Sequence, residues 1–239
     1  MQLLISFELD EPLILPISYL HILQSIVYNS IRTEDGLSEF LHDVGLKYQS
    51  RTFKPFTFSW FKGHYQIRGK QICFDENVAF EVRSVYPEIL QCIHDNIRTH
   101  GIRIGEKQYT DIHMEFQDVN IQSEVSKIKM RTPMCISSTT ETGRHYYCPD
   151  EKLFFRLIQD NFRRKYTAYF GEEPLLDIQL KRVKVTPRDK VVTKYQRNMI
   201  TAWLGIYELS GPREYLDFCF HAGLGGRNAQ GFGMFDFIR

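Results

Sequence analysis

The sequence contains no long hydrophobic run and no large excess of either charge. None of its 239 residues belongs to an uninterrupted apolar stretch of the ~18–20 residues that a membrane-spanning helix needs. The first residues, MQLLISFELDEP, have no basic segment and reach an acidic side chain at Glu8. This pattern excludes a secretory signal peptide. We therefore expect a cytoplasmic protein with no membrane partner.

Cysteine and histidine pairs at metal-ligand spacing are also missing. The five cysteines include no Cys-x-x-Cys pair, and the eight histidines include no His-x-x-x-His or His-x-x-Glu-His pair. An odd number of scattered cysteines does not form a disulfide framework, and zinc sites need paired ligands. We expect reduced thiols, no metal site and no cofactor. The cysteines are Cys73, Cys92, Cys135, Cys148 and Cys219.

The composition is that of a folded globular protein, 43% hydrophobic and 25% charged. The net charge is only +1, but it is unevenly spread, because residues 1–50 carry seven acidic and two basic side chains. Segment 181–197 contains one acidic residue, Asp189, among basic ones: Lys181, Arg182, Lys184, Arg188, Lys190, Lys194 and Arg197. A basic hairpin of this kind indicates either contact with a polyanion or a solvated surface of alternating charge.

Apolar spacing in the first half predicts the βαββαβ order of a ferredoxin-like unit. Leu20, Leu23, Val27 and Ile31 fall on one face of a helix, and Pro87 and Gly101 bracket another. The expected elements are a strand over 3–9, helices from 17 and over 36–44, a strand over 56–61, a hairpin of 64–67 with 71–74, a helix over 87–101, and strands over 102–104 and 109–116.

The polar segment 117–126 is the predicted junction, after which the order repeats. The expected elements are a strand over 127–137, a helix over 150–169 capped by Asp150, strands over 176–185, 190–195 and 199–209, a helix over 212–222 and a strand over 232–238. The sequence thus predicts an α+β fold of two tandem ferredoxin-like (RRM-like) domains, 1–118 and 119–239.

A glycine-rich loop precedes the last predicted strand. It reads Gly223-Leu224-Gly225-Gly226-Arg227-Asn228-Ala229-Gln230-Gly231-Phe232-Gly233. Because it follows a helix and lacks a Gly-Lys-Ser/Thr ending, it is neither a dinucleotide fingerprint nor a P-loop. Its glycines allow main-chain N–H groups to approach an anion, although a plain tight turn is the alternative. The candidates for contact with an anionic ligand are Gly225, Gly226, Arg227, Asn228, Gln230 and Gly231.

This loop resembles the signature of the CRISPR-associated repeat-processing endoribonucleases, which belong to a superfamily of double ferredoxin-like RNA-binding proteins. The similarity extends to Tyr28-Asn29-Ser30-Ile31, Leu41-His42-Asp43 and Phe56-Thr57-Phe58-Ser59. The resemblance implies metal-independent cleavage of CRISPR precursor RNA within its repeats. The 2′-OH of a ribose attacks the adjacent phosphorus and leaves a 2′,3′-cyclic phosphate and a 5′-OH end. By position, the implied catalytic residues are His42, Tyr28 and Lys54.

The residues themselves fit that chemistry. At 100° per residue, His42 points away from the apolar stripe of its predicted helix, and an exposed imidazole suits proton transfer near neutral pH. Tyr28 lies at the flank of the apolar stripe of its helix. It is either an aromatic residue at the edge of the core or a residue whose hydroxyl contacts substrate. Lys47 and Arg51 compete with Lys54 for the phosphate.

The remaining candidates are secondary. His113 and His221 are reserve histidines, and we expect Arg163, Arg164 and Lys165 to form a solvated helix face. With the resemblance, the predicted RNA-binding residues are those of the glycine-rich loop (Gly225, Gly226, Arg227, Asn228, Gln230 and Gly231) and the cations Lys47, Arg51, Lys181, Arg182, Lys184, Arg188 and Lys190. The resemblance implies CRISPR repeat RNA and an effector ribonucleoprotein as partners, and we expect the chain to be a monomer or homodimer. The alternatives are a catalytically inactive RNA-binding relative or effector subunit, and a ferredoxin-like ligand-binding module.

Overall fold

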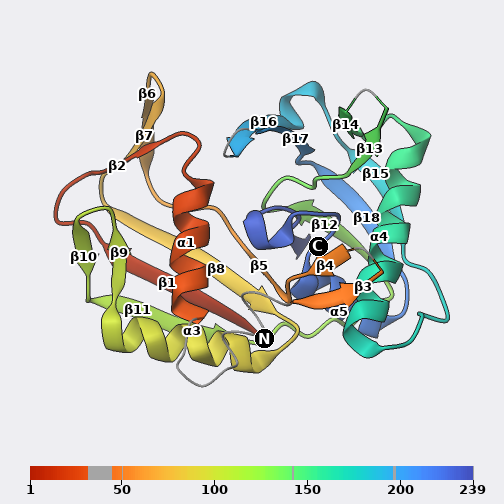
Figure 1. Cartoon of the computed structure of the whole chain (residues 1–239), viewed down its shortest axis with the longest axis horizontal. Coiled ribbons are helices and arrows are strands. Elements are labelled where there is room, and N and C mark those ends of the chain that lie inside the picture. Colours follow the sequence, from red (N-terminus) through yellow and green to blue (C-terminus); the bar gives the residue numbers. More distant parts are fainter. Residues whose placement is uncertain (32–44, 50, 142, 196–197, 239) are drawn as a thin grey trace.

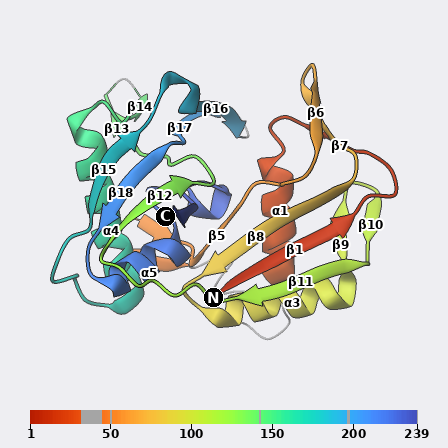
Figure 2. The ribbon, with the colours of Figure 1, turned by 180° about the vertical axis from the view of Figure 1, so that it is seen from behind.

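The structure is a computed structural model that describes residues 1–31, 45–49, 51–141, 143–195 and 198–238. The first half forms an antiparallel sheet of β1 (Gln2–Glu8), β5 (Phe56–Phe58), β8 (Asn77–Ser84) and β11 (Ile112–Gln117), in the order β11-β1-β8-β5. Helices α1 (Leu20–Ile31) and α3 (Pro87–His100) belong to this half. Figure 1 shows α1 in front of the sheet, and Figure 2 shows the strands in front of α1.

Both helices bury the apolar stripe that the sequence predicts. In α1 the buried residues include Leu20, Leu23, Val27 and Ile31, so this helix begins slightly later than expected. Helix α3 begins at Pro87, where a missing N–H costs no helical hydrogen bond, and ends before Gly101, whose φ of 69° disfavours other residues. The helix predicted over 36–44, with His42, lies outside the described residues.

The second half repeats this plan. Its sheet contains β12 (Val125–Met130), β15 (Gln179–Lys184), β18 (Ile206–Ser210) and β19 (Phe235–Ile238), in the order β15-β18-β12-β19. Its helices are α4 (Lys152–Phe170) and α5 (Arg213–Ala222). Counted in chain order within each half, the first sheet read from β11 and the second sheet read from β19 both run fourth, first, third, second. The predicted α+β fold of two tandem ferredoxin-like units is confirmed, and the boundary between 118 and 119 stays a prediction.

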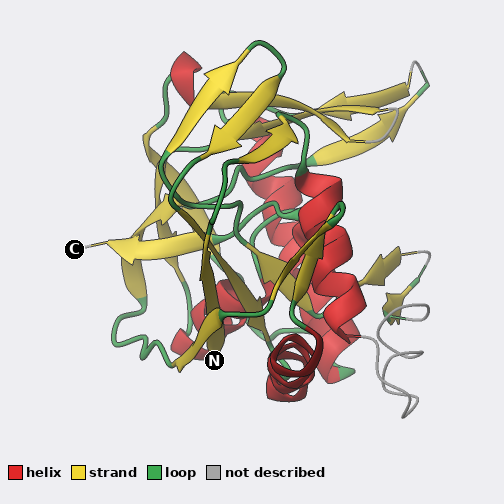
Figure 3. Cartoon of the chain, turned by 90° about the vertical axis from the view of Figure 1, so that its left-hand side faces the viewer, coloured by secondary structure: helices red, strands yellow, loops and turns green. Residues whose placement is uncertain are grey.

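Short hairpins and turns extend both units, and Figure 3 shows some of them projecting beyond the sheets and the long helices. They are β2 (Leu13–Pro16), β3 (Leu46–Tyr48), β4 (Arg51–Phe53), β6 (Tyr65–Arg68), β7 (Gln71–Phe74), β9 (Ile102–Ile104), β10 (Lys107–Tyr109), β13 (Ser137–Thr140), β14 (Gly143–Tyr146), β16 (Lys190–Tyr195), β17 (Asn198–Trp203), η2 (Pro187–Asp189) and η3 (Asn228–Gln230).

Strand β8 is a central strand of its sheet, yet apolar patterning does not predict it. It buries two charged residues, Glu81 and Arg83, which are 4% and 1% exposed. The Arg83 guanidinium donates to Glu81 at 2.5 Å, and to the Phe235 carbonyl and the Asp236 carboxylate of β19 at 2.5 and 2.8 Å. Pairing makes burial of these charges tolerable and ties the two sheets together.

The expected basic hairpin at 181–197 is wrong. Strand β15 pairs with β18, and β16 pairs with β17, so the two basic segments lie in different sheets separated by the η2 turn. The strand expected over 199–209 is two strands, because Gly205, at φ 121°, breaks it. Asp150 does not cap α4: the N-cap is Glu151, and Asp150 instead accepts a hydrogen bond from Arg182.

The two halves share packing at their junction. The core of the first half also contains Cys135, Ile200 and Phe232 from the second. Within the described part of the chain, no helix is long and apolar enough to cross a membrane.

Candidate functional site

A cavity of about 690 Å³ lies between the two halves, and we call it the basic cleft. Its walls come from α1, the β3–β4 hairpin, β13, α4 and the glycine-rich loop. Six cationic side chains line it, and none of the described lining residues is Asp or Glu. Such a one-sign lining attracts a polyanion. The six are Arg51, Lys54, Arg144, Arg164, Lys165 and Arg227.

Helix α1 contributes uncharged hydrogen-bonding groups to this cleft. Tyr28 packs edge-on against Phe56, with ring centroids 5.4 Å apart. Burial raises the pKa of the Tyr28 phenol above its usual value, although a hydrogen bond with Gln24 opposes that shift. Gln24 also donates from Nε2 to the Ala229 carbonyl at 2.9 Å and accepts a hydrogen bond from the Tyr195 hydroxyl. The tyrosine hydroxyl is therefore neutral near pH 7 and held by a bridge to the loop.

Lys54 follows β4 and lines the same cavity. Its carbonyl accepts a hydrogen bond of 3.1 Å from the Tyr169 hydroxyl of α4, which anchors this segment to the second half. The chain passes Lys54 closely at Gly45, where an added Cβ would lie 3.3 Å from Lys54 Cδ and 2.7 Å from Thr52 Cγ2. His42 precedes Gly45 by three residues in the sequence and lies outside the described residues.

Three arginines crowd one wall of the cleft. Burial lowers the pKa of the Arg51 guanidinium, and the positive charges of Arg164 and Arg144 lower it further. In the described part of the chain no carboxylate pairs with any of these three. Cations that repel one another without a counter-charge favour binding of a phosphate group, which relieves the repulsion.

Lys165 was expected on a solvated face and is instead 3% exposed. Its ammonium donates to the Gly223 carbonyl and, at 3.1 Å, to Asn228 Oδ1. Burial lowers the pKa of this ammonium to about 8. Asn228 Nδ2 in turn donates to the carbonyls of Leu224 and Phe232, at 3.1 and 3.0 Å. Lys165 therefore braces the glycine-rich loop from α4.

The glycines of the loop serve close packing of backbone. A Cβ at Gly233, whose φ is +80°, would lie 2.0 Å from the Leu224 carbonyl oxygen, and one at Gly225 would lie 2.7 Å from that of Cys135. Several loop N–H groups already donate to carbonyls, as Gly226 does to Cys135 at 2.8 Å and Gly231 to Asn228 at 3.0 Å. Positive charge for an anion therefore comes from side chains such as Arg227 more than from an open cradle of N–H groups.

Comparison with known proteins identifies the family of this chain. The family model of CRISPR associated protein Cas6, C-terminal, matches residues 114–237, which is more than half of the chain. The chain belongs to the Cas6 family.

Curated Cas6 relatives resemble it over nearly its whole length. A CRISPR-associated endoribonuclease Cas6 of Pyrococcus furiosus is 23% identical, covering 97% of this chain and 86% of the relative. A second, from Methanocaldococcus jannaschii, is 22% identical, covering 98% and 91%. These Cas6 relatives support an endoribonuclease that acts in CRISPR RNA processing. The chain also resembles a solved structure described as a RAMP protein binding different RNA substrates. The match covers 100% of each of the two chains, with a TM-score of 0.81 and 19% sequence identity. This likeness shows a shared fold.

The structure brings part of the predicted Cas6-type residue set together. Tyr28, Lys54 and Arg51 line the basic cleft with the glycine-loop residues Gly225, Gly226, Arg227, Asn228 and Gln230. Gly231 lies against Phe58 and Trp60 instead. The other predicted RNA-binding cations do not line the cleft: Lys47, Lys181, Arg182, Lys184, Arg188 and Lys190. Arg182 is ion-paired with Asp150, and Lys181 is 72% exposed at 3.8 Å from Glu208.

The reserve histidines lie elsewhere. His221 is 6% exposed, and its Nδ1 donates to the Asp217 carbonyl at 3.0 Å, so it packs as an interior residue of α5. His113 is exposed on β11, opposite Ser6 of β1. Neither lines the basic cleft.

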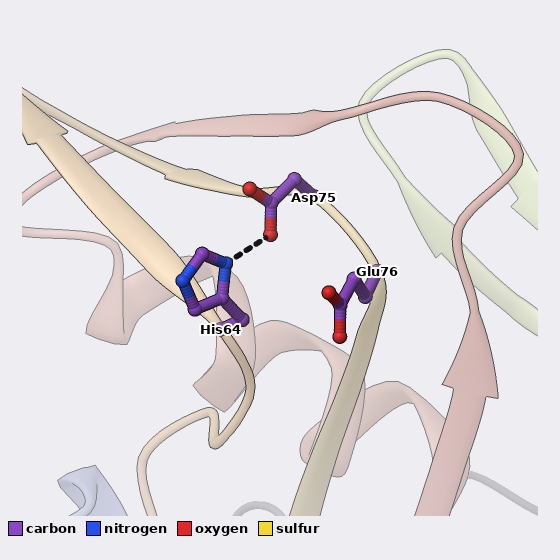
Figure 4. Close-up of side chains that lie close together, drawn as sticks. All are labelled: His64, Asp75 and Glu76. Atoms are coloured by element: carbon purple, nitrogen blue, oxygen red, sulfur yellow. Dashed lines mark hydrogen bonds and ion pairs between the residues drawn. The ribbon is translucent and has the colours of Figure 1, made fainter.

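One group of described residues brings a histidine and carboxylates close together. His64, Asp75 and Glu76 lie near β6 and β7, with ligand atoms within 4.8 Å of one another (Figure 4). The His64 ring donates from Nδ1 to Asp75 at 2.8 Å, and this partner raises the pKa of His64. The arrangement is an ordinary surface ion pair, and none of the three residues lines the cleft.

Sequence reasoning missed Lys165, Gln24 and Arg144. A signal existed for Lys165, because it continues the stripe of Phe154, Ile158 and Tyr169 along α4, where a charged residue requires a buried partner. Gln24 carries a similar signal, since it lies one helical turn before Tyr28. Arg144 lies in a hairpin that apolar patterning did not predict.

Proposed function

We propose that the chain is a metal-independent endoribonuclease that cuts CRISPR precursor RNA within its repeats. The 2′-oxygen of one ribose attacks the adjacent phosphorus, the bond from phosphorus to the 5′-oxygen breaks, and the products carry a 2′,3′-cyclic phosphate and a 5′-OH. The observation that carries the proposal is the basic cleft, which Tyr28, Lys54 and the glycine-rich loop line together with further cationic side chains.

The proposed reaction needs three kinds of chemical group. A base must take the proton of the 2′-OH, an acid must protonate the departing 5′-oxygen, and positive charge must stabilise the pentacoordinate phosphorus. We assign the proton transfers to His42, because histidine is the residue type whose unperturbed pKa lies closest to neutral pH. Lys54 stabilises the phosphorane, with Arg51 as the neighbouring cation in the same wall.

Tyr28 has an orienting role in this proposal. Because burial raises the pKa of its phenol, the hydroxyl keeps its proton at working pH and donates a hydrogen bond instead of acting as a base. The bridge through Gln24 to Ala229 holds that hydroxyl toward the loop. Tyr28 therefore orients the 2′-OH or binds a phosphate oxygen.

The donor set of the cleft suits catalysis by side-chain cations. Divalent ions that assist phosphoryl chemistry are held by carboxylates, and the described lining residues include none. In their place the cleft offers lysine and arginine side chains, which stabilise developing negative charge directly.

Cleavage of a labelled repeat transcript from the host's own CRISPR array, in the presence of EDTA, tests this proposal. The intact RNA should be cut within the repeat, and the same RNA with a 2′-deoxy substitution at the scissile nucleotide should remain whole. End analysis should show a 5′-OH on the downstream product. A requirement for divalent metal, or cleavage of the deoxy RNA, would contradict the mechanism.

The same experiment decides between an enzyme and an inactive RNA-binding relative. A chain that binds the repeat tightly but never cuts it would be a repeat-binding or effector subunit. Sedimentation of the protein alone and with its product would show whether it works as a monomer or a homodimer, and whether it keeps the cleaved RNA for an effector complex.

A further inference from the structure

A second cavity lies beside the basic cleft, and we call it the side pocket. It encloses about 480 Å³ between the start of α1 and strand β16. This volume is within the range of ligand-sized pockets. It shares one wall residue, Gln24, with the basic cleft. The lining residues are Ser18, His21, Gln24, Ser25, Lys194 and Tyr195.

The side pocket is lined by polar groups that match a ribonucleotide. Two serine hydroxyls, an amide, a phenol, an imidazole and an ammonium line it, and its described wall contains no carboxylate. Lys194 is exposed on β16, with no acidic partner among the described residues. An ammonium without a counter-charge, set among hydroxyls, favours a phosphodiester over an apolar ligand.

The ring of His21 is fixed in a useful tautomer. Its Nδ1 lies 2.9 Å from the Ser18 carbonyl oxygen. Because a carbonyl only accepts, Nδ1 carries the proton, and Nε2 of the neutral ring is an acceptor. In the described part of the chain Nε2 has no hydrogen-bond partner. An acceptor held in this way can receive a ribose 2′-OH, a group that DNA lacks.

Gln24 joins the two cavities. Its amide contacts Ala229 of the glycine-rich loop on one side and the Tyr195 hydroxyl on the other. From His21 to Tyr28 the helix axis rises by about 10 Å, a short distance along a nucleic acid strand. Neighbouring nucleotides of one strand can therefore occupy both cavities by passing over the Gln24 bridge.

We propose that the side pocket binds a ribonucleotide that flanks the scissile linkage, with Lys194 on its phosphate and His21 Nε2 on its 2′-OH. This inference rests on the proposed function, because the same RNA strand occupies the basic cleft. The side pocket thereby adds affinity for RNA over DNA at a nucleotide that takes no part in the reaction.

Thermodynamic cycles that pair a protein change with an RNA change test the proposal. The probe is the repeat RNA from the host's array, made uncleavable by a 2′-deoxy group at the mapped scissile nucleotide. A second 2′-deoxy group is then moved along the flanking nucleotides. At one flanking nucleotide the second 2′-deoxy group should lower the affinity of the wild type about fivefold. His21→Ala should bind the RNAs with and without this second 2′-deoxy group equally. A neutral methylphosphonate at the adjoining linkage should show the same coupling with Lys194→Gln.

Matched controls remove the effects of fold and general charge. His100→Ala changes an exposed histidine whose Nδ1 likewise donates to a main-chain carbonyl, that of Asn96 at 3.2 Å. Lys107→Gln removes a lysine of β10, which lies at the far end of the first half (Figure 1). Both controls should keep the wild-type response at every nucleotide.

The outcomes separate the two proposals. Coupling at one flanking nucleotide for His21 and Lys194, with none for the controls, supports the side pocket. Cleavage of the repeat RNA by the wild type together with no coupling at any position would overturn the side pocket alone. Failure of the wild type to bind or cut the repeat RNA would overturn the proposed function as well.

Discussion

Helices α1 and α4 hold the same place in the repeated order of the two halves, and they line the basic cleft with different chemistry. Helix α1 presents the uncharged Gln24 and Tyr28, whereas α4 presents Arg164 and Lys165. In the proposed mechanism the uncharged groups of α1 orient the reacting atoms, whereas the cations of α4 attract the RNA and hold the glycine-rich loop. We therefore expect changes in the first half to slow cleavage and changes on α4 to weaken binding or the loop.

The largest effect should come from His42→Ala. Loss of a general acid–base group lowers the rate by about 100- to 10,000-fold. The measurement is the single-turnover cleavage rate of repeat RNA, with the dissociation constant measured in parallel. Affinity should stay near that of the wild type. The exposed His100→Ala is the control, and an unchanged rate in His42→Ala would remove the histidine from the mechanism.

Tyr28→Phe should lower the cleavage rate by about 100-fold, as loss of a single preorganised donor does. The phenyl ring keeps its contact with Phe56, so folding and affinity should persist. Because burial raises the pKa of this phenol, it stays protonated, and the loss should be the same factor across about pH 6 to 9. Weaker RNA binding with an unchanged cleavage rate would assign Tyr28 to RNA binding and not to orientation of the reacting atoms.

Lys165 should make stability depend on pH. Its pKa is about 8 in the folded chain. An unfolded lysine keeps a pKa of about 10.4, so between these values the unfolded state binds more protons and the free energy of unfolding rises with pH. We expect a gain of about 2 kcal/mol from pH 8 to 10 relative to Lys165→Met, measured by denaturant titration. If the free energy of unfolding varied with pH in the same way in the wild type and in Lys165→Met, burial of the Lys165 ammonium would be contradicted.

The smallest effect should come from Arg164→Gln. Loss of one phosphate contact should reduce the dependence of log affinity on log salt by about 0.7 for a single strand. The cleavage rate of bound RNA should change little. Arg163→Gln is the matched control, because its guanidinium is paired with Asp177 at 2.5 Å and does not line the cleft. Equal effects of the two variants would show only general charge attraction.

Local patterning predicted the repeated order of elements because most strands and helices bury an apolar face. It failed at β8, where Glu81 and Arg83 are buried as an ion pair. Patterning assigns a charged residue to the surface, because it does not detect the partner that makes burial possible. It also failed at segment 181–197, because pairing with β18 or β17 depends on distant strands.

The cleft was partly predictable from the sequence. The glycine-rich loop, Tyr28 and Lys54 were identified by resemblance, and they line one cavity. Lys165 and Gln24 were missed because their importance comes from contacts with Gly223, Asn228 and Ala229, which lie far away in the sequence. The buried stripe of α4 indicates that Lys165 is buried, but periodicity does not identify the distant partner that accepts its hydrogen bond.

Trp60 gives the molecule an optical reporter of the glycine-rich loop. Its indole nitrogen donates to the Gly231 carbonyl at 2.7 Å, and its ring meets Phe232 edge-on. The chain has only one other tryptophan, Trp203. In a Trp203→Phe background, Trp60 would be the single tryptophan, and its fluorescence needs no added dye. A change in its emission would show whether the loop moves when precursor RNA binds and when the product is released.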